Sequence, residues 1–114
     1  MLERMRNLVP PEKSDDFVRR VFAKFDASSS KLLAQIEAAL ADDDAAGLGQ
    51  AVHTLKSSSA QLGADALAQH CAQLEQALRD RRRDDFEWLV ESISLELAAV
   101  RRELADRNGA ADDD

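Results

Sequence analysis

The stretch DAAGLGQAVHTLKSSSAQLG, residues 44–63, decides the fold and contains the candidate site. Its apolar residues recur every three or four positions, which predicts a helix that starts after Asp43 or Asp44. Gly63 is a natural stop for this helix, because glycine is favoured just past a helix end. Helical geometry, at about 100° per residue, gathers one face that must be buried. That face comprises Leu48, Ala51, Leu55, Ser58, Ser59 and Leu62, with Val52 at its edge.

His53 falls nearly opposite the centre of this apolar face and is therefore predicted to point into solvent. Its neighbours on the exposed side are all small, and Lys56 flanks it one turn on. The exposed stripe of a surface helix normally carries long charged side chains. Either the small residues leave a low surface on which another protein can settle, or alanine is simply common in this chain. The small neighbours are Gly49, Ser57, Ala60 and Ala64.

Before this stretch, the spacing predicts one long helix that begins near Ser14 or Asp15 and ends near residues 42–44. Three consecutive serines, residues 28–30, permit a bend in its middle. Pro10 and Pro11 separate it from a short helical lead-in at the N-terminus, because proline cannot continue a helix. Its expected apolar stripe is Phe17, Val21, Phe25, Ser28, Leu32, Ile36 and Leu40.

After Gly63, two further helices are expected. Asp65 can cap the first, whose core positions are Leu67, Cys71, Leu74 and Leu78. The basic run 79–83 suits the negative end of that helix, and the acidic pair 84–85 suits the start of the next. The last helix is expected to end at residues 108–109. Its apolar face is Phe86, Leu89, Ile93, Leu97, Val100 and Leu104.

Four amphipathic helices with short connections predict an all-α fold, an antiparallel up-down four-helix bundle with a short N-terminal lead-in helix. Its expected parts are a lead-in at 1–12, the bundle at 13–108 and an acidic tail at 109–114. A chain of 114 residues suits one such domain.

The charge and cysteine content narrow the possible functions. The net charge of -7 argues against binding to a nucleic-acid backbone. No apolar run approaches the roughly 20 residues of a membrane span, and no signal peptide is evident, so we expect a cytoplasmic protein without membrane insertion. Cys71 is the only cysteine, so no internal disulfide can form and a zinc site would lack thiolate ligands.

An exposed histidine with these neighbours suits a phosphate carrier. A neutral imidazole nitrogen is a competent nucleophile near neutral pH. The Lys56 ammonium could lie beside a phosphoryl group on His53. No nucleotide-binding Gly-Lys loop or acidic metal cluster is evident, so the chain is expected to be no autonomous kinase or hydrolase and to need no cofactor. A partner must then supply the metal, expected to be Mg²⁺, and the carboxylate that gives or takes the phosphate.

The run from His53 to Ala64, HTLKSSSAQLGA, resembles the signature of histidine-phosphotransfer (HPt) domains, and the resemblance extends over roughly residues 17–104. It implies a four-helix bundle that relays phosphate between aspartates of response-regulator receiver domains. His53 then matches the phosphoacceptor and Lys56 the lysine beside it. Glu75 matches a position where the family has Gln or Glu bonded to the imidazole.

The resemblance also implies partners and a partner-facing surface. Receiver domains and a hybrid sensor histidine kinase are the expected partners, and the chain is expected to be a monomer. Gln61 joins the small residues around His53 on this surface, and Arg79 could add positive charge, although a helix-end arginine is an equally good interpretation. Ser57 departs from the family, which most often has glycine there.

Two alternatives stay open at this point. The chain could be the related phosphoacceptor domain of a chemotaxis-type kinase, or a helical module that binds receiver domains without carrying phosphate. His70 and Trp88 are expected to be packing residues rather than parts of a site.

Overall fold

The computed structural model describes the backbone of residues 14–112 and the side chains of residues 16–106. This part of the chain consists of α-helices and one short 3-10 turn, with no strand among its residues. In chain order the elements are α2 (Ser14–Ala41), α3 (Ala45–Leu62), α4 (Asp65–Arg79), η1 (Arg83–Asp85) and α5 (Phe86–Asp112). The expected lead-in helix, and the side chains proposed to cap α2, lie outside the described residues.

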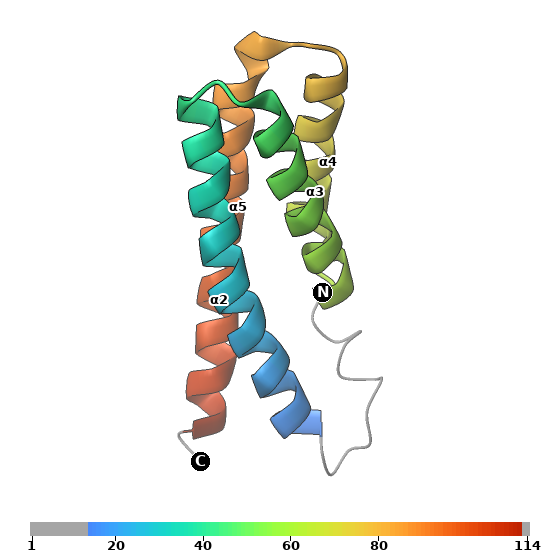
Figure 1. The fold of residues 1–114 in the computed structure, drawn as a ribbon. Helices are drawn as coiled ribbons and strands as arrows, with labels where there is room; N and C mark the ends of the chain where they lie inside the picture. Colours follow the sequence, from blue (N-terminus) through green and yellow to red (C-terminus); the bar gives the residue numbers. More distant parts are fainter. Residues whose placement is uncertain (1–13, 113–114) are drawn as a thin grey trace.

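The four helices form an antiparallel bundle in which each helix packs against its neighbours in sequence, and α5 closes the bundle against α2 (Figure 1). The predicted all-α bundle is confirmed. The helices differ in length, because α2 has 28 residues and α5 has 27, whereas α3 has 18 and α4 has 15. Figure 1 shows the far ends of α2 and α5 continuing past the ends of α3 and α4.

The first turns of α2 bury a face one residue away from the predicted one, although Phe25 is buried as predicted. Val18 and Phe22 are buried where Phe17 and Val21 were expected, and those two are only partly covered. Ser29 is fully buried and Ser28 is exposed, again one position away from the prediction. The cause is that two adjacent apolar pairs, 17–18 and 21–22, offer two possible stripes, and periodicity alone cannot choose between them.

The three serines of α2 satisfy their hydroxyls on the helix itself. Ser28 donates to the Phe25 carbonyl, and Ser29 and Ser30 both donate to the Asp26 carbonyl. Back-bonding of this kind lets a serine lie in a helix and tends to bend it. The N-terminal part of α2 leans away from the axis of its C-terminal part in Figure 1, as a bend at these serines would produce.

The ends of α3 follow the sequence closely. Asp44 is the N-cap and accepts a hydrogen bond from the Gly47 backbone N–H at 3.0 Å. Gly63 closes the helix in the left-handed conformation, with φ of 88°, which glycine adopts without steric cost. The predicted buried face is present, except that Val52 is fully buried rather than at the edge and Ser58 is half-buried.

Two predicted helix boundaries are wrong. Asp65 is the first residue inside α4 rather than its cap, and the N-cap is Ala64, which has no side chain able to cap. The carboxylate of Asp65 still lies at the positive end of the helix dipole. Helix α5 continues through Asn108–Gly109 to Asp112, because a glycine inside a helix costs only about 1 kcal/mol and does not force a stop.

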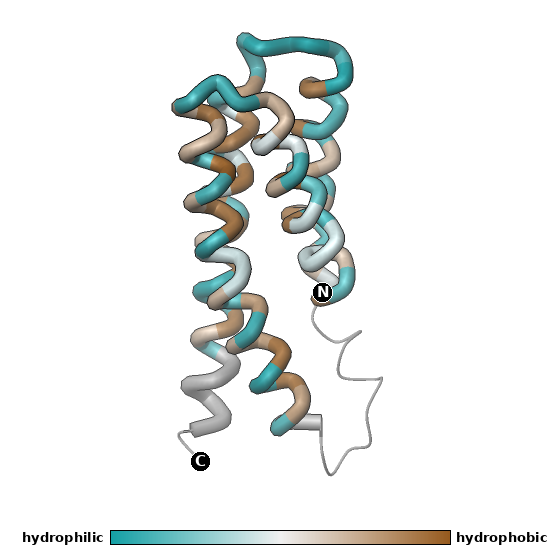
Figure 2. Tube along the Cα trace, in the orientation of Figure 1, coloured by the Kyte–Doolittle hydropathy of each residue, from teal (hydrophilic) through white to brown (hydrophobic). Residues whose placement is uncertain are grey.

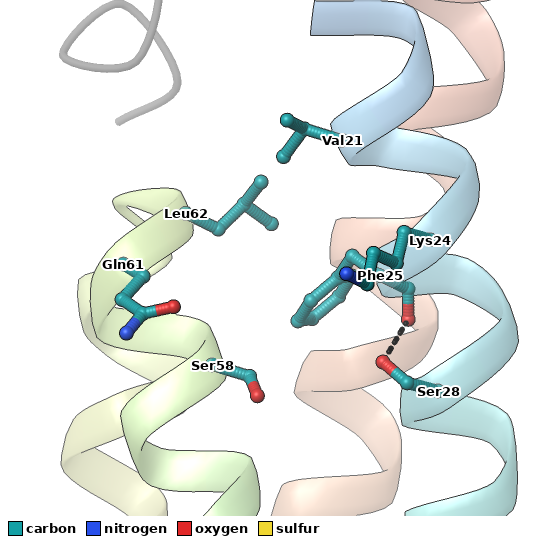
Figure 3. Close-up of a pocket in the computed structure, with 7 residues that line it drawn as sticks. All are labelled: Val21, Lys24, Phe25, Ser28, Ser58, Gln61 and Leu62. Carbon is teal, nitrogen blue, oxygen red and sulfur yellow. Dashed lines mark hydrogen bonds between the residues drawn. The ribbon is translucent and has the colours of Figure 1, made fainter.

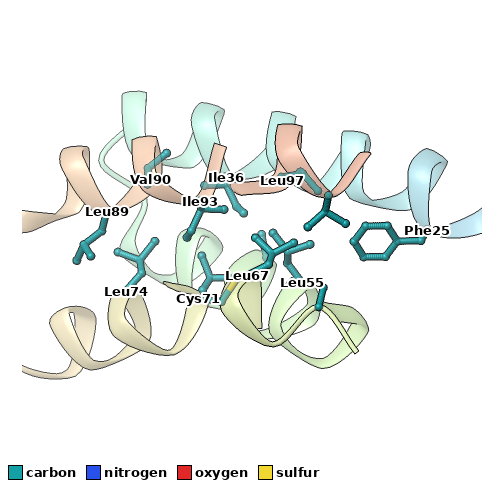
Figure 4. Close-up of a cluster of buried hydrophobic side chains, with 14 of the residues drawn as sticks. Phe25, Ile36, Leu55, Leu67, Cys71, Leu74, Leu89, Val90, Ile93 and Leu97 are labelled. Atoms are coloured by element: carbon teal, nitrogen blue, oxygen red, sulfur yellow. The ribbon is translucent and has the colours of Figure 1, made fainter. Parts of the chain in front are cut away.

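The core is a single cluster of mostly aliphatic side chains, and Phe25 lies at one end of the part drawn in Figure 4. Figure 2 shows apolar positions recurring along all four helices. The largest fully buried side chains are Ile36, Leu48, Leu55, Leu62, Leu67, Leu74, Ile93 and Leu97. Among the predicted core positions of α4, Leu78 is only partly covered, and Ala77 is fully buried beside it.

Cys71 is fully buried in this core. Burial raises the pKa of its thiol to about 12, and the negative charge of Glu75, one turn further along α4, adds to this effect. The thiol therefore stays protonated and serves as a small apolar side chain.

Both connections at one end of the bundle contain a residue in the left-handed conformation that is not glycine. Asp43, between α2 and α3, has φ of 59°, and Arg81, between α4 and η1, has φ of 57°. The two connections are joined by an ion pair between Asp43 and the Arg83 guanidinium. Asp43 therefore has a compensating contact for its backbone strain.

We predict that Arg81→Gly stabilises the protein. Glycine relieves the cost of the left-handed conformation, and the exposed Arg81 side chain has no ion pair among the described residues, so the expected gain is about 0.5–1 kcal/mol. Urea unfolding measures it. Asp43→Gly is the matched control, because it relieves the same strain but loses the contact with Arg83, and should gain less. A fall in stability for Arg81→Gly would contradict this account.

Candidate functional site

His53 lies on the outer face of α3, near the middle of the helix, and its side chain is 65% exposed. Val52 and Leu55, on either side of it in sequence, are fully buried in the core. Their burial fixes the rotation of α3, so the histidine is forced outward as the sequence predicts. The imidazole is thus mounted on a rigid helix rather than on a loop.

Glu75 of α4 connects His53 to Lys56. One carboxylate oxygen, Oε2, lies 2.9 Å from His53 Nδ1, and the other, Oε1, lies 2.5 Å from Lys56 Nζ. The Glu75 side chain is only 12% exposed, whereas the two groups it holds are more open to solvent. A single carboxylate therefore orders both functional side chains of α3 from the neighbouring helix.

The ionised carboxylate of Glu75 fixes the tautomer of the neutral His53 imidazole. Partial burial alone would raise the pKa of Glu75, but the hydrogen bonds from Lys56 and His53 outweigh it, and the net pKa lies below its ordinary value of 4.5. At neutral pH the carboxylate has no proton to donate, so the Nδ1–H of His53 must be the donor. In the neutral imidazole the other ring nitrogen, Nε2, then carries the lone pair.

In the structure the Lys56 ammonium lies on the Glu75 carboxylate, and its place beside a phosphoryl group on His53 stays a prediction. The four-carbon side chain of a lysine is flexible, so the ammonium can reach either the Glu75 carboxylate or a phosphoryl group on His53. Sequence reasoning missed this ion pair because it joins two helices whose relative rotation is not encoded in local spacing.

Among the predicted surface residues, Ser57, Ala60 and Gln61 are exposed on the same side of α3 as His53. Gly49 is half-buried, and a Cβ built on it would lie 3.7 Å from Leu78 of α4. The surface around the imidazole therefore carries short side chains as expected, and α4 borders it on one side.

Two predicted members of this surface lie elsewhere. Ala64 is fully buried, because the chain leaves the helix at Gly63 and the rotation of α3 no longer applies to it. Arg79 donates to the side-chain oxygen of Gln76 at 2.7 Å, and Gln76 in turn donates to Asp80. Arg79 therefore belongs to a polar cluster at the end of α4, which agrees with its interpretation as a helix-end arginine.

A groove between α2 and α3 opens beside this stripe (Figure 3). It encloses about 290 Å³, and its walls are chiefly apolar. Gln61 is shared between the groove and the exposed stripe. Residue spacing alone does not predict this groove, because its α2 wall depends on which of two possible apolar stripes that helix buries. The lining residues are Val21, Lys24, Phe25, Ser28, Ser58, Gln61 and Leu62.

Comparison with known proteins identifies the family of the chain. The family model described as Hpt domain matches residues 20–103. The chain belongs to the Hpt domain family. Members of this family are phosphocarriers of two-component phosphorelays, so the chain has a role in histidine phosphotransfer.

A solved structure agrees with the family assignment. The crystal structure of histidine-containing phosphotransfer protein B (HptB) from Pseudomonas aeruginosa PAO1 matches with a TM-score of 0.81 and 28% sequence identity. The match covers 87% of this chain and 86% of that one. A search of curated proteins found no match of comparable significance.

The described part of this Hpt domain offers no cluster of three or more His, Cys, Asp and Glu side chains that could hold a metal ion. None of its described helices is both long and apolar enough to cross a membrane. The second histidine, His70, is half-buried on α4, and its Nδ1 is buried without a hydrogen-bond partner among the described residues.

We predict that Glu75→Gln removes an acid-sensitive part of the stability of this Hpt domain. Because the pKa of Glu75 is lowered on folding, its contribution is fully present above pH 4.5 and is lost as the pH falls through the lower folded value. The difference in unfolding free energy between wild type and variant should be roughly 0.5–1 kcal/mol near neutral pH, because solvent screens the partly exposed partners.

Urea unfolding at a series of pH values between about 6 and about 3 measures this difference, which should shrink toward the acid end. Glu91→Gln, at an exposed glutamate of α5, is the control and should show no such trend. A difference that stays constant down to the lowest pH would contradict the assignment.

Proposed function

We propose that this Hpt domain accepts a phosphoryl group on His53 Nε2 from an aspartyl phosphate of a receiver domain and passes it to a second receiver domain. The observation that carries the proposal is the hydrogen bond between His53 Nδ1 and the Glu75 carboxylate. It leaves Nε2 as the nitrogen with a free lone pair, on a side chain that is 65% exposed.

In the transfer step, the Nε2 lone pair forms a bond to phosphorus, and the bond between phosphorus and the aspartate oxygen breaks. The carboxylate of the partner leaves with the electron pair. No proton needs to move, because the positive charge that develops on the ring is met by the Glu75 carboxylate at Nδ1. Transfer to a second receiver domain is the reverse of this step.

We propose that the Lys56 ammonium balances the negative charge of the phosphoryl group. Its ammonium lies on Glu75 in the unphosphorylated structure, one turn from His53, and is 35% exposed. A dianionic phosphoryl group on Nε2 attracts the same ammonium, and the flexible side chain allows it to turn from the carboxylate toward the phosphoryl oxygens. Phosphoryl transfer depends mainly on positioning and on charge stabilisation of this kind.

The partner surface that we propose combines the low stripe around His53 with the neighbouring groove. Ala60 and Ser57 keep the surface beside the imidazole open to a docking protein, and Gln61 leads into the apolar groove between α2 and α3. Apolar side chains flanked by polar ones are typical of protein-binding surfaces. The receiver domain would bring Mg²⁺ and the aspartate that gives or takes the phosphoryl group, because the proposed site of this chain provides neither.

The test of this function is transfer from a phosphorylated receiver domain. The chain has two histidines, so His70→Gln is a matched control for His53→Gln. Wild type and His70→Gln should become labelled with acid-labile phosphate, and His53→Gln should not. Equal labelling of His53→Gln would refute the assignment, and binding of the receiver domain without any labelling would favour the module that binds without carrying phosphate.

We further predict that Lys56→Ala slows transfer from the receiver domain to His53. Loss of one charge-assisted contact to the phosphoryl group should reduce the rate about tenfold, equivalent to about 1.4 kcal/mol of transition-state stabilisation. Rapid-quench measurement of labelling gives this rate. Lys31→Ala, at an exposed lysine of α2, is the control and should transfer at the rate of wild type. An unchanged rate for Lys56→Ala would remove Lys56 from the proposed site.

A further inference from the structure

The side of His53 that faces away from α4 carries a serine. At about 100° per residue, Lys56 is displaced about 60° from His53 around the helix axis, and Ser57 is displaced about 40° in the opposite sense. The contact between Lys56 Nζ and Glu75 shows that the Lys56 side faces α4. Ser57 therefore borders the imidazole on the side that no charged group of α4 occupies.

The orientation of the ring directs a phosphoryl group toward this side. The Nδ1 edge of the imidazole is turned to α4 by the 2.9 Å hydrogen bond with Glu75. Nε2 lies across the ring from Nδ1, so a group attached to it projects away from α4. Side chains in a helix lean toward its N-terminus, and the Ser57 side chain thus leans over the turn that carries His53.

The Ser57 hydroxyl is available to a ligand. Two other hydroxyls of the same helix are already engaged, because Thr54 donates to the Gln50 carbonyl at 3.1 Å and Ser59 donates to the Leu55 carbonyl at 2.7 Å. Ser57 is exposed, and its hydroxyl neither donates nor accepts a hydrogen bond within the described part of the chain. A free donor one helical turn from the phosphoacceptor can therefore meet a phosphoryl oxygen without breaking an existing contact.

We propose that Ser57 is a phosphoryl-binding residue, whose hydroxyl donates a hydrogen bond to an oxygen of the phosphoryl group on His53 Nε2. The inference rests on the proposed function, since it requires phosphate on His53. Ser57 and Lys56 then contact the phosphoryl group from opposite sides, while Glu75 holds the ring. A hydrogen bond to the dianion favours that form, so Ser57 lowers the pKa of the second phosphoryl ionisation.

The experiment measures that ionisation on the isolated protein. Phosphoramidate, a small phosphoryl donor, phosphorylates histidine without a protein partner, and phosphorus NMR follows the phosphohistidine signal as the pH is varied. Ser57→Ala and Ser57→Gly should each raise the phosphoryl pKa by about half a unit relative to wild type. The charged neighbours Lys56 and Glu75 are unchanged in both variants, so the shift reports the hydroxyl.

Thr54→Ala is the matched control, because it removes an exposed hydroxyl of the same helix that is already bonded to a carbonyl. It should leave the phosphoryl pKa at the value of wild type. The inference is overturned if Ser57→Ala titrates like wild type, or if Thr54→Ala produces an equal shift. Equal phosphoramidate labelling of His53→Gln would place the phosphate on another residue and overturn it as well.

The same phosphorylated proteins, offered to a receiver domain, separate this inference from the proposed function. Failure of wild type to transfer its phosphate would refute the relay, whereas the comparison of pKa values would still decide the role of Ser57. Normal transfer by wild type, together with identical titration of Ser57→Ala, would refute the role of Ser57 and leave the relay intact.

Discussion

The carboxylate of Glu75 is the contact on which the site depends. It approaches His53 and Lys56 from α4, although both of those residues belong to α3. Its two oxygens hold one ring nitrogen and one ammonium, and its lowered pKa keeps it charged at neutral pH. Because the carboxylate cannot donate a proton, the imidazole is limited to one tautomer. The direction in which the histidine can react is therefore set from outside its own helix.

This arrangement requires that α3 and α4 keep a fixed relative rotation, and the core provides it. Leu55 of α3 and Cys71 and Leu74 of α4 are fully buried. Close packing of such side chains leaves little freedom to slide or turn, so the acidic side chain above them stays within reach of both partners. The apolar interior thus acts on the polar site through geometry, and the site itself makes only a small contribution to the stability of the bundle.

The predictions from sequence failed where local spacing was ambiguous or where the chain left a helix. Adjacent apolar pairs in the first half of α2 allowed two stripes, and the wrong one was predicted. Ala64 was placed beside His53 by continuing the rotation of α3 past Gly63, where the helix has already ended. Arg79 lies one turn after Glu75 on α4, but its guanidinium donates to Gln76 instead.

The sequence by itself determined the four-helix bundle, the ends of α3 and the exposure of His53. These follow from hydrophobic periodicity and from the conformations of Asp44 and Gly63, which are local properties of the chain. Only the tertiary structure decided that Lys56 rests on Glu75 and that a groove lies between α2 and α3. Both depend on how two helices are rotated against each other, and that rotation is fixed by packing of the whole core, not by the spacing of residues within one helix.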